Sequence, residues 1–184
     1  LLIHDDIMDR DLLRRGEKTL FYQYGELAGK ARRERTGQDG GAGAAAQLET
    51  GGSGDLLPGT EAYHHGESLG ICAGDIGYFL AFGELALLEI PQPLLRQLVQ
   101  RWSRELAAVG LAQMQDIELG MRPGPAREEE VLSLYRYKTA RYTFSLPLWT
   151  GALLAGQERP VRERLEEAGE TLGVFYIESP ATRQ

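Results

Sequence analysis

Apolar residues recur every three or four positions over most of the chain, whereas alternating or β-branched runs are scarce. This spacing gathers apolar side chains on one face of an α-helix, so the pattern predicts an all-α protein. Proline marks several junctions, as at Pro91 and Pro93, and Pro147 predicts a kink or an end within one helix. We expect helical segments at residues 1–13, 20–33, 61–89, 92–121, 127–156 and 159–177.

One stretch interrupts this pattern. Between Thr36 and Thr60 the sequence holds eight glycines and an alanine triplet but no aromatic residue. Few of these side chains can offset the entropy lost when the backbone is ordered. We therefore expect residues 34–60 to form a flexible Gly/Ala-rich loop inserted into a single domain that covers 1–184.

Composition narrows the class of protein. The 184 residues are 42% hydrophobic and 26% charged, which suits a globular domain with a core. The net charge of −7 opposes the clustered basic surface that nucleic acid requires, so we expect no nucleic-acid partner. We see neither an apolar run near 20 residues nor a signal peptide, and expect a soluble cytoplasmic protein without a transmembrane segment. Cys72 is the only cysteine, which excludes an internal disulfide.

Both ends of the sequence look cut. The chain opens on the apolar run Leu1-Leu2-Ile3 instead of Met, and it stops soon after Val174-Phe175-Tyr176-Ile177. We expect this chain to be an internal piece of a longer protein.

The first candidate site is the run Asp5-Asp6-Ile7-Met8-Asp9. A spacing of four places Asp5 and Asp9 on one helix face, with Asp6 beside them. Carboxylates this close repel unless a cation intervenes, and their oxygens suit Mg²⁺ shared with substrate phosphates. Arg14 and Arg15 follow, and guanidinium groups match phosphate oxygens. The pattern indicates a diphosphate site, with a solvated acidic face as the alternative.

Two further helices carry polar residues in apolar stripes. The seam of residues 95, 99, 102, 106 and 109 continues into Gln113 and Asp116, which indicates a polar pocket at the end of an apolar wall. A single buried amide that sets helix register is the alternative. Lys138 interrupts the next stripe, with Thr139 beside it and tyrosines around it. This arrangement fits a phosphate-binding lysine, and an ordinary exposed lysine is the alternative.

Together these motifs resemble those of the trans-isoprenyl diphosphate synthases, the polyprenyl synthetase family. Asp5-Asp6-Ile7-Met8-Asp9 with Arg14-Arg15-Gly16 is similar to the first aspartate-rich motif of that family. Ala73-Gly74-Asp75 resembles its Ala-Gly-Asp helix, Gln113 and Asp116 its Gly-Gln-x-x-Asp motif with Ala112 in place of the glycine, and Lys138-Thr139 its Lys-Thr pair. The resemblance covers nearly all of the chain outside residues 31–60.

The resemblance implies a helical bundle of the isoprenoid synthase type around a central cavity, and usually a homodimer. It implies a Mg²⁺-dependent prenyltransferase that condenses isopentenyl diphosphate with an allylic diphosphate into a polyprenyl diphosphate, geranylgeranyl or longer. By this analogy Asp5, Asp6 and Asp9 bind Mg²⁺, Arg14 contacts the allylic diphosphate, and Arg15 contacts isopentenyl diphosphate. Gln113, Lys138 and Thr139 steady the leaving group.

The sequence departs from the family pattern at two places. After Leu172-Gly173-Val174-Phe175-Tyr176, which resembles the approach to a second aspartate-rich motif, no Asp follows. The N-terminal Gly-Lys and Arg residues that hold isopentenyl diphosphate in the family are also absent. Because metal-assisted ionisation depends on such ligands, we expect little or no synthase activity from this polypeptide alone.

Other classes of protein share single features of this sequence. A metal phosphohydrolase of the HD type would need more metal ligands than His4-Asp5 supplies, and class I terpene cyclases are not expected to carry both the Arg-Arg-Gly and the Lys-Thr pair. A non-catalytic partner subunit or degenerate member of the same fold remains the main alternative. Leu1 is not aromatic, which disfavours the shortest products, but the product length stays open.

Overall fold

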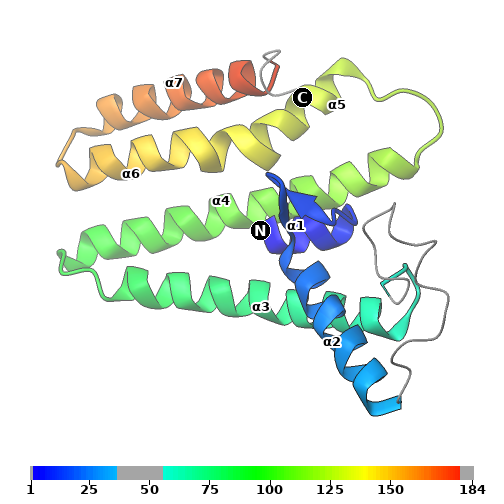
Figure 1. Cartoon of the computed structure of the whole chain (residues 1–184). Helices are drawn as coiled ribbons and strands as arrows, with labels where there is room; N and C mark the ends of the chain where they lie inside the picture. Colours follow the sequence, from blue (N-terminus) through cyan, green and yellow to red (C-terminus); the bar gives the residue numbers. More distant parts are fainter. Residues whose placement is uncertain (1, 37–55, 179–184) are drawn as a thin grey trace. The chain divides into compact units, whose positions relative to one another are not determined.

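The computed structural model describes residues 2–36 and 56–178 and divides into two compact units, Leu1–Glu84 and Leu85–Gln184. Helices dominate both units, which confirms the all-α class (Figure 1). The elements are α1 (Leu2–Met8), β1 (Leu13–Arg14), β2 (Glu17–Lys18), α2 (Leu20–Thr36), α3 (Glu61–Ala86), α4 (Gln92–Met121), α5 (Glu128–Leu134), the π-helix η2 (Tyr135–Ser145), α6 (Leu146–Leu154) and α7 (Arg159–Glu178). We describe each unit by itself.

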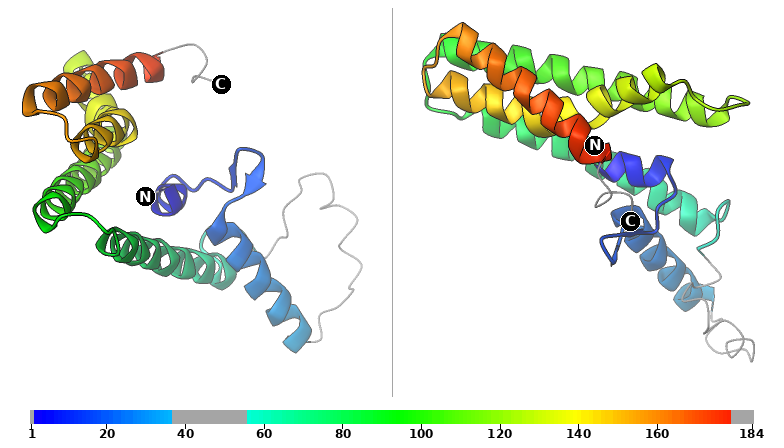
Figure 2. Two further views of the ribbon diagram at one scale, coloured as in Figure 1. Left: turned by 90° about the vertical axis from the view of Figure 1, so that its left-hand side faces the viewer. Right: turned by 90° about the horizontal axis from the view of Figure 1, so that it is seen from above.

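In the first unit, α2 crosses the N-terminal part of α3 (Figures 1 and 2). The crossing is close because two glycines face each other: a Cβ atom at Gly66 would lie 3.0 Å from the backbone nitrogen of Gly25. Thr60 caps α3, since its Oγ1 accepts a hydrogen bond from the Tyr63 N–H at 3.3 Å. A small core forms around this crossing, made of Phe21, Tyr22, Leu56, Ala62 and Tyr63.

The predicted helix over residues 1–13 is wrong beyond Met8. Leu13 and Arg14 instead pair with Lys18 and Glu17 in a short antiparallel hairpin. Its two turn residues, Arg15 and Gly16, have φ values of 54° and 82°, and a two-residue hairpin turn of the I′ type needs positive φ at both. Turn geometry therefore outweighed the apolar spacing that favoured a longer helix.

The predicted flexible loop falls mostly outside the described residues, which omit 37–55. Its described ends are ordered parts of the fold. Residues 34–36 complete α2, and Leu56 is buried against Gly25. The single domain over 1–184 stays a prediction.

The second unit is a set of packed helices. α5, η2 and α6 follow one another without a break, and α7 returns alongside η2 and α6 (Figure 2). Glycines let α7 approach closely, since a Cβ atom at Gly169 would lie 2.8 Å from the Ser145 backbone nitrogen. The buried apolar residues of this unit are Leu98, Val109, Ala112, Leu134, Ala140, Leu146, Ala152 and Leu153.

The helix predicted over 127–156 is continuous, but its middle is not α-helical. Eleven residues, Tyr135–Ser145, form a π-helix, and the Leu146 N–H bonds the carbonyl of Arg141, five residues earlier. Pro147 follows directly in the first turn of α6. Since proline has no N–H and its ring crowds the carbonyl four residues back, we attribute the wider preceding turns to Pro147. Such π segments often occur at functional sites.

One helix within the described ranges, α3, is long and apolar enough by composition to cross a membrane, with a window of mean hydropathy 1.3. Only 11% of this window is buried, whereas the core helices of soluble proteins that meet the same criterion are mostly buried, and an isolated match is weak evidence. α3 also carries Glu67 and Asp75, and other helices pack on its glycines. We therefore interpret α3 as a helix of a folded unit.

Candidate functional site

One cluster of candidate site residues lies in the first unit, where two carboxylates meet one guanidinium. Arg14 Nε donates to Asp6 Oδ1 at 2.5 Å, and Arg14 Nη2 lies 3.6 Å from Asp5 Oδ2. Asp6 is buried, at 6% exposed, so it needs a charged partner. Burial lowers the pKa of Arg14, but the hydrogen bond and charge of Asp6 outweigh this effect and raise that pKa above its ordinary value.

The hairpin explains why Arg14 reaches the acids. Thr19, at its far end, is buried and donates its hydroxyl hydrogen to the Asp11 carbonyl at 2.8 Å, which fixes the loop after α1. Arg14 on β1 therefore folds back over α1, while Arg15 sits in the turn and is exposed. The structure thus separates the two arginines that are neighbours in sequence.

The third predicted carboxylate, Asp9, lies just after the end of α1. Its backbone N–H still bonds the Asp5 carbonyl at 2.9 Å, so Asp9 keeps its helical register one turn from Asp5. Across residues 2–36 and 56–178, however, no three His, Cys, Asp or Glu side chains converge as a ready metal cluster. The acids that the structure brings together are Asp5 and Asp6.

These residues fit a magnesium ion. Asp5 and Asp6 already converge on one cation, the Arg14 guanidinium, and supply hard oxygen atoms. Mg²⁺ is typically held by one or two carboxylates together with substrate phosphates and water, so a three-carboxylate cluster is not required. Asp5 and Asp6 are the residues best placed to hold it, and Asp9 lies one turn away.

A separate cluster of candidate site residues lies in the second unit, on α4 and η2. Lys138 Nζ donates to Asp116 Oδ2 at 2.6 Å, and the Lys138 side chain is only 26% exposed. Lys138 is therefore partly covered and ion-paired, and its role in binding phosphate stays a prediction. Thr139 is half-buried beside it. Tyr137, one of the predicted framing aromatics, instead stacks with Arg141, whose guanidinium carbon lies 5.5 Å from the ring centre.

Gln113 is the most buried of the candidate residues in this cluster. It is 8% exposed, and its buried Nε2 has no hydrogen-bond partner in the described part of the chain. A buried amide donor without a partner costs free energy, so its position favours a ligand oxygen over a purely structural role. The sequence predicted this buried position.

The apolar seam predicted on α4 is partly wrong. Val109 and Gln113 are buried as expected, but Val99 is exposed, and the buried stripe instead includes Leu98 and Glu105. Charged residues are seldom buried unless they are paired. Ion pairs with Arg101 and Arg141 accompany the burial of Glu105.

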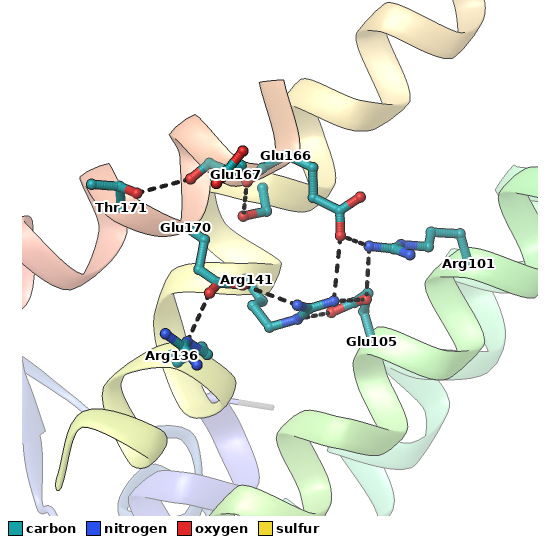
Figure 3. Close-up of polar contacts among 9 residues, drawn as sticks. Arg101, Glu105, Arg136, Arg141, Glu166, Glu167, Glu170 and Thr171 are labelled. Atoms are coloured by element: carbon teal, nitrogen blue, oxygen red, sulfur yellow. Dashed lines mark hydrogen bonds and ion pairs between the residues drawn. The ribbon is translucent and has the colours of Figure 1, made fainter. Parts of the chain in front are cut away.

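Glu105 is the centre of a charged network that joins α4, η2 and α7 (Figure 3). Arg141 donates to both Glu105 oxygens, at 2.7 and 2.9 Å, and to Glu170 at 3.0 Å. Arg101 pairs with Glu105 and Glu166, and Arg136 pairs with Glu170. The hydrogen bonds to Glu105 outweigh burial and hold the pKa of Arg141 above its ordinary value.

Sequence reasoning missed this network. Its one local signal was the spacing of four between Arg101 and Glu105, which is common on exposed helix faces. The other partners come from separate helices, so only the tertiary fold reveals them. Because Arg141 lies three residues after Lys138, the network fixes the helix that carries the phosphate-binding candidates.

The chain matches a known protein family over most of its length. The family model described as polyprenyl synthetase matches residues 59–177, well over half of the chain. The matched range includes Gln113, Asp116, Lys138 and Thr139 but not the Asp5–Arg14 region. No curated protein matches the chain significantly by sequence.

Solved structures extend the likeness to the N-terminal region. The geranylgeranyl pyrophosphate synthase from Corynebacterium glutamicum, complexed with isoprenyl diphosphate and magnesium, is 27% identical with a TM-score of 0.72, and the match covers 94% of this chain. Another geranylgeranyl pyrophosphate synthase (22% identical, TM-score 0.67) and the synthetase from the archaeon Geoglobus acetivorans (24%, 0.65), each also matched over 94% of this chain, share the fold. The chain spans only 41%, 39% and 42% of the lengths of these three structures.

Proposed function

Because the chain belongs to the polyprenyl synthetase family, we propose that it forms part of a Mg²⁺-dependent prenyltransferase that condenses isopentenyl diphosphate with an allylic diphosphate. The observation that carries this proposal is the convergence of Asp5 and Asp6 on Arg14. Paired carboxylates beside a guanidinium provide both halves of a metal–diphosphate site. The product would be a polyprenyl diphosphate, geranylgeranyl or longer.

The residues of the first unit would take the metal and the phosphates. Asp5 and Asp6, with Asp9 one turn away, would hold Mg²⁺ against the allylic diphosphate. Arg14 would exchange its carboxylate partners for oxygens of that diphosphate, since a guanidinium binds both kinds of oxygen in the same bidentate way. Arg15, exposed in the hairpin turn, would contact isopentenyl diphosphate.

The residues of the second unit would steady the leaving group. Lys138 supplies a positive charge, Thr139 a hydroxyl and Gln113 a buried amide donor, and all three can bind phosphate oxygens. Asp116 holds Lys138 in place at 2.6 Å. These roles follow the family resemblance, with the pairing and burial in the structure as support.

The chemistry follows from this charge distribution. The allylic C–O bond breaks with its electron pair leaving on the diphosphate, the isopentenyl double bond attacks the allylic carbon, and a proton is lost to restore a double bond. When bound, Mg²⁺ neutralises the charge that develops on the departing diphosphate. By the family resemblance, Arg14 and Lys138 would each add positive charge that stabilises the departing diphosphate. On the family resemblance we also propose a cytoplasmic homodimer.

Binding of a diphosphate tests this proposal. We expect the purified chain to bind an S-thiolo analogue of an allylic diphosphate in isothermal titration calorimetry only when Mg²⁺ is present. Asp5→Asn and Lys138→Gln should each weaken binding about tenfold or more, since each removes a charge-assisted contact. Glu34→Gln and Lys30→Gln, which change exposed residues of α2 outside the site, should leave the affinity unchanged.

Two results would oppose the proposal. Failure to bind the analogue with Mg²⁺ would contradict the diphosphate site itself. Binding that ignores both a chelator and Asp5→Asn would favour the non-catalytic partner subunit, because such a protein does not need metal.

A further inference from the structure

The helix that carries Asp5 and Asp6 is held by α3 of the same unit. α1 has seven residues, fewer than the roughly 12 to 15 that an isolated helix needs to persist in water. Its placement must therefore come from packing. A Cβ atom at Gly70 of α3 would lie 2.7 Å from Ile7 Cδ1, and one at Gly74 would overlap the ring of His4.

His4 is the more specific of these two contacts. Its Nε2 lies 3.1 Å from Asp75 Oδ1, and its ring stacks on Tyr78 with centroids 5.8 Å apart and 14° between the planes. An ionised carboxylate only accepts, so the Nε2–H of His4 is the donor. The imidazole is therefore held on three sides by α3, through Gly74, Asp75 and Tyr78.

The contact of His4 with α3 affects Asp5 and Asp6, because these residues are adjacent in sequence. His4 directly precedes Asp5 and Asp6, and Ile7 directly follows them. Rotation of α1 about its axis would have to break the His4–Asp75 bond and lift the imidazole off Gly74. The two α3 contacts therefore fix the direction in which both carboxylates point.

We propose that His4, bonded to Asp75 and seated on Gly74, is a positioning residue for the metal-binding carboxylates Asp5 and Asp6. This inference rests on the proposed function, because it assumes that those carboxylates hold Mg²⁺. His4 does not contact the metal in this role. It acts through the orientation of α1, as outer residues do when they fix metal ligands through a hydrogen bond.

Binding of Mn²⁺ in the presence of inorganic pyrophosphate tests the role, with free Mn²⁺ measured by electron paramagnetic resonance. His4→Phe keeps an aromatic ring over Gly74 but loses the donor, and it should weaken Mn²⁺ binding about 10- to 100-fold. His4→Gln, whose amide N–H can reach Asp75, should recover most of the affinity. His64→Phe makes the same change at an exposed histidine of α3 and should have no effect.

The partner residue gives an independent pair of variants. Asp75→Asn keeps an acceptor oxygen for His4 and should retain binding, whereas Asp75→Ala should lose as much as His4→Phe. Circular dichroism and thermal unfolding establish that each variant is folded. If His4→Phe does not fold, the comparison of Asp75→Asn with Asp75→Ala still decides the matter.

The outcomes separate the two proposals. Wild-type Mn²⁺ affinity in folded His4→Phe and Asp75→Ala would overturn the positioning role and leave the metal site intact. A wild-type chain that binds no Mn²⁺ with pyrophosphate would overturn the metal site and, with it, the role of His4. Loss in both His4→Phe and His4→Gln together with wild-type affinity in folded Asp75→Ala would overturn the role of the His4–Asp75 bond and assign the loss to the changed shape of the side chain.

Discussion

Arg14, which we propose to bind a diphosphate, is paired with two carboxylates in this structure. Its guanidinium offsets part of the negative charge of Asp5 and Asp6. Lys138 and Asp116 form an analogous pair in the second unit. In each of the two clusters a cation proposed to bind diphosphate is held by a carboxylate.

The pairing of Arg14 with Asp5 and Asp6 predicts that Arg14→Gln affects the binding of metal and of pyrophosphate in opposite directions. The substitution removes the cation that pairs with both carboxylates, so Mn²⁺ alone should bind more tightly to the variant. Binding of pyrophosphate with Mn²⁺ should weaken about tenfold, because a charge-assisted contact to phosphate is lost. Calorimetry with each ligand measures the two effects separately.

The control for this substitution is Arg35→Gln, which changes an exposed arginine of α2. It should alter neither affinity. If Arg14→Gln instead weakened Mn²⁺ binding in the absence of pyrophosphate, Arg14 would stabilise the carboxylates in their metal-binding position and would not compete with the metal for them.

Residue types and their spacing were enough to predict several of these contacts. Asp5, Asp6 and Arg14 were predicted as one cluster and do meet, and the burial of Gln113 was also predicted. The hydrogen bond of Lys138 with Asp116 was not predicted, although both residues were singled out. Glu105 could not be found this way, because its charge matches a surface residue and its partners lie on other helices.

At the scale of elements, apolar periodicity located the helices well but not their internal form. The α4 segment was predicted at its observed bounds, 92–121. The hairpin over residues 13–18 was missed because a two-residue turn leaves little trace in periodicity. The π-helix was missed because it shares its apolar spacing with an ordinary helix, and only the hydrogen bonds differ.

The packing of α7 on η2 predicts a sharp size limit at Gly173. A Cβ atom there would lie 2.5 Å from Ala140 Cβ, so Gly173→Ala must push the helices apart and should cost about 1–3 kcal/mol of unfolding free energy. Gly110→Ala is the matched control, because no atom lies within 4 Å of its new methyl. It should stabilise the chain by up to about 1 kcal/mol through helix propensity. Urea unfolding followed by circular dichroism measures both, and equal effects would refute the close approach.

The charged network predicts a second contrast within the same unit. Glu105→Gln leaves Arg141 and Arg101 without their shared buried carboxylate and should lower the free energy of unfolding by about 3 kcal/mol. Glu163→Gln breaks a pair with Arg159 that is exposed on both sides, and should cost less than about 0.5 kcal/mol. The same urea titration compares them. Similar small losses would show that the network contributes little to stability.

At the scale of the whole molecule, the sequence predicted the all-α class and the family, and both are confirmed. The family was predicted from the order and spacing of the motifs along the chain. The homodimer and the magnesium dependence stay proposals.

The activity of the isolated polypeptide is the prediction that belongs to this scale. After Phe175 the printed sequence contains no Asp, whereas the family resemblance implies a second aspartate-rich metal motif there. A loss of several kcal/mol of metal stabilisation in the transition state would slow ionisation by about a thousandfold or more, at tenfold per 1.36 kcal/mol. Binding of the allylic diphosphate is proposed to depend on residues that are present, Asp5, Arg14 and Lys138, and should persist.

Incorporation of labelled isopentenyl diphosphate into longer products measures this separation of binding from turnover. The Corynebacterium glutamicum synthase is the positive control, and Asp5→Ala, Asp9→Ala and a chelator are the negative controls. We expect the chain to bind the allylic analogue with Mg²⁺ yet to give product only near the level of the negative controls. Condensation at a rate comparable to the positive control would mean that Asp5, Asp6 and Asp9 suffice for ionisation, and that the second motif is dispensable.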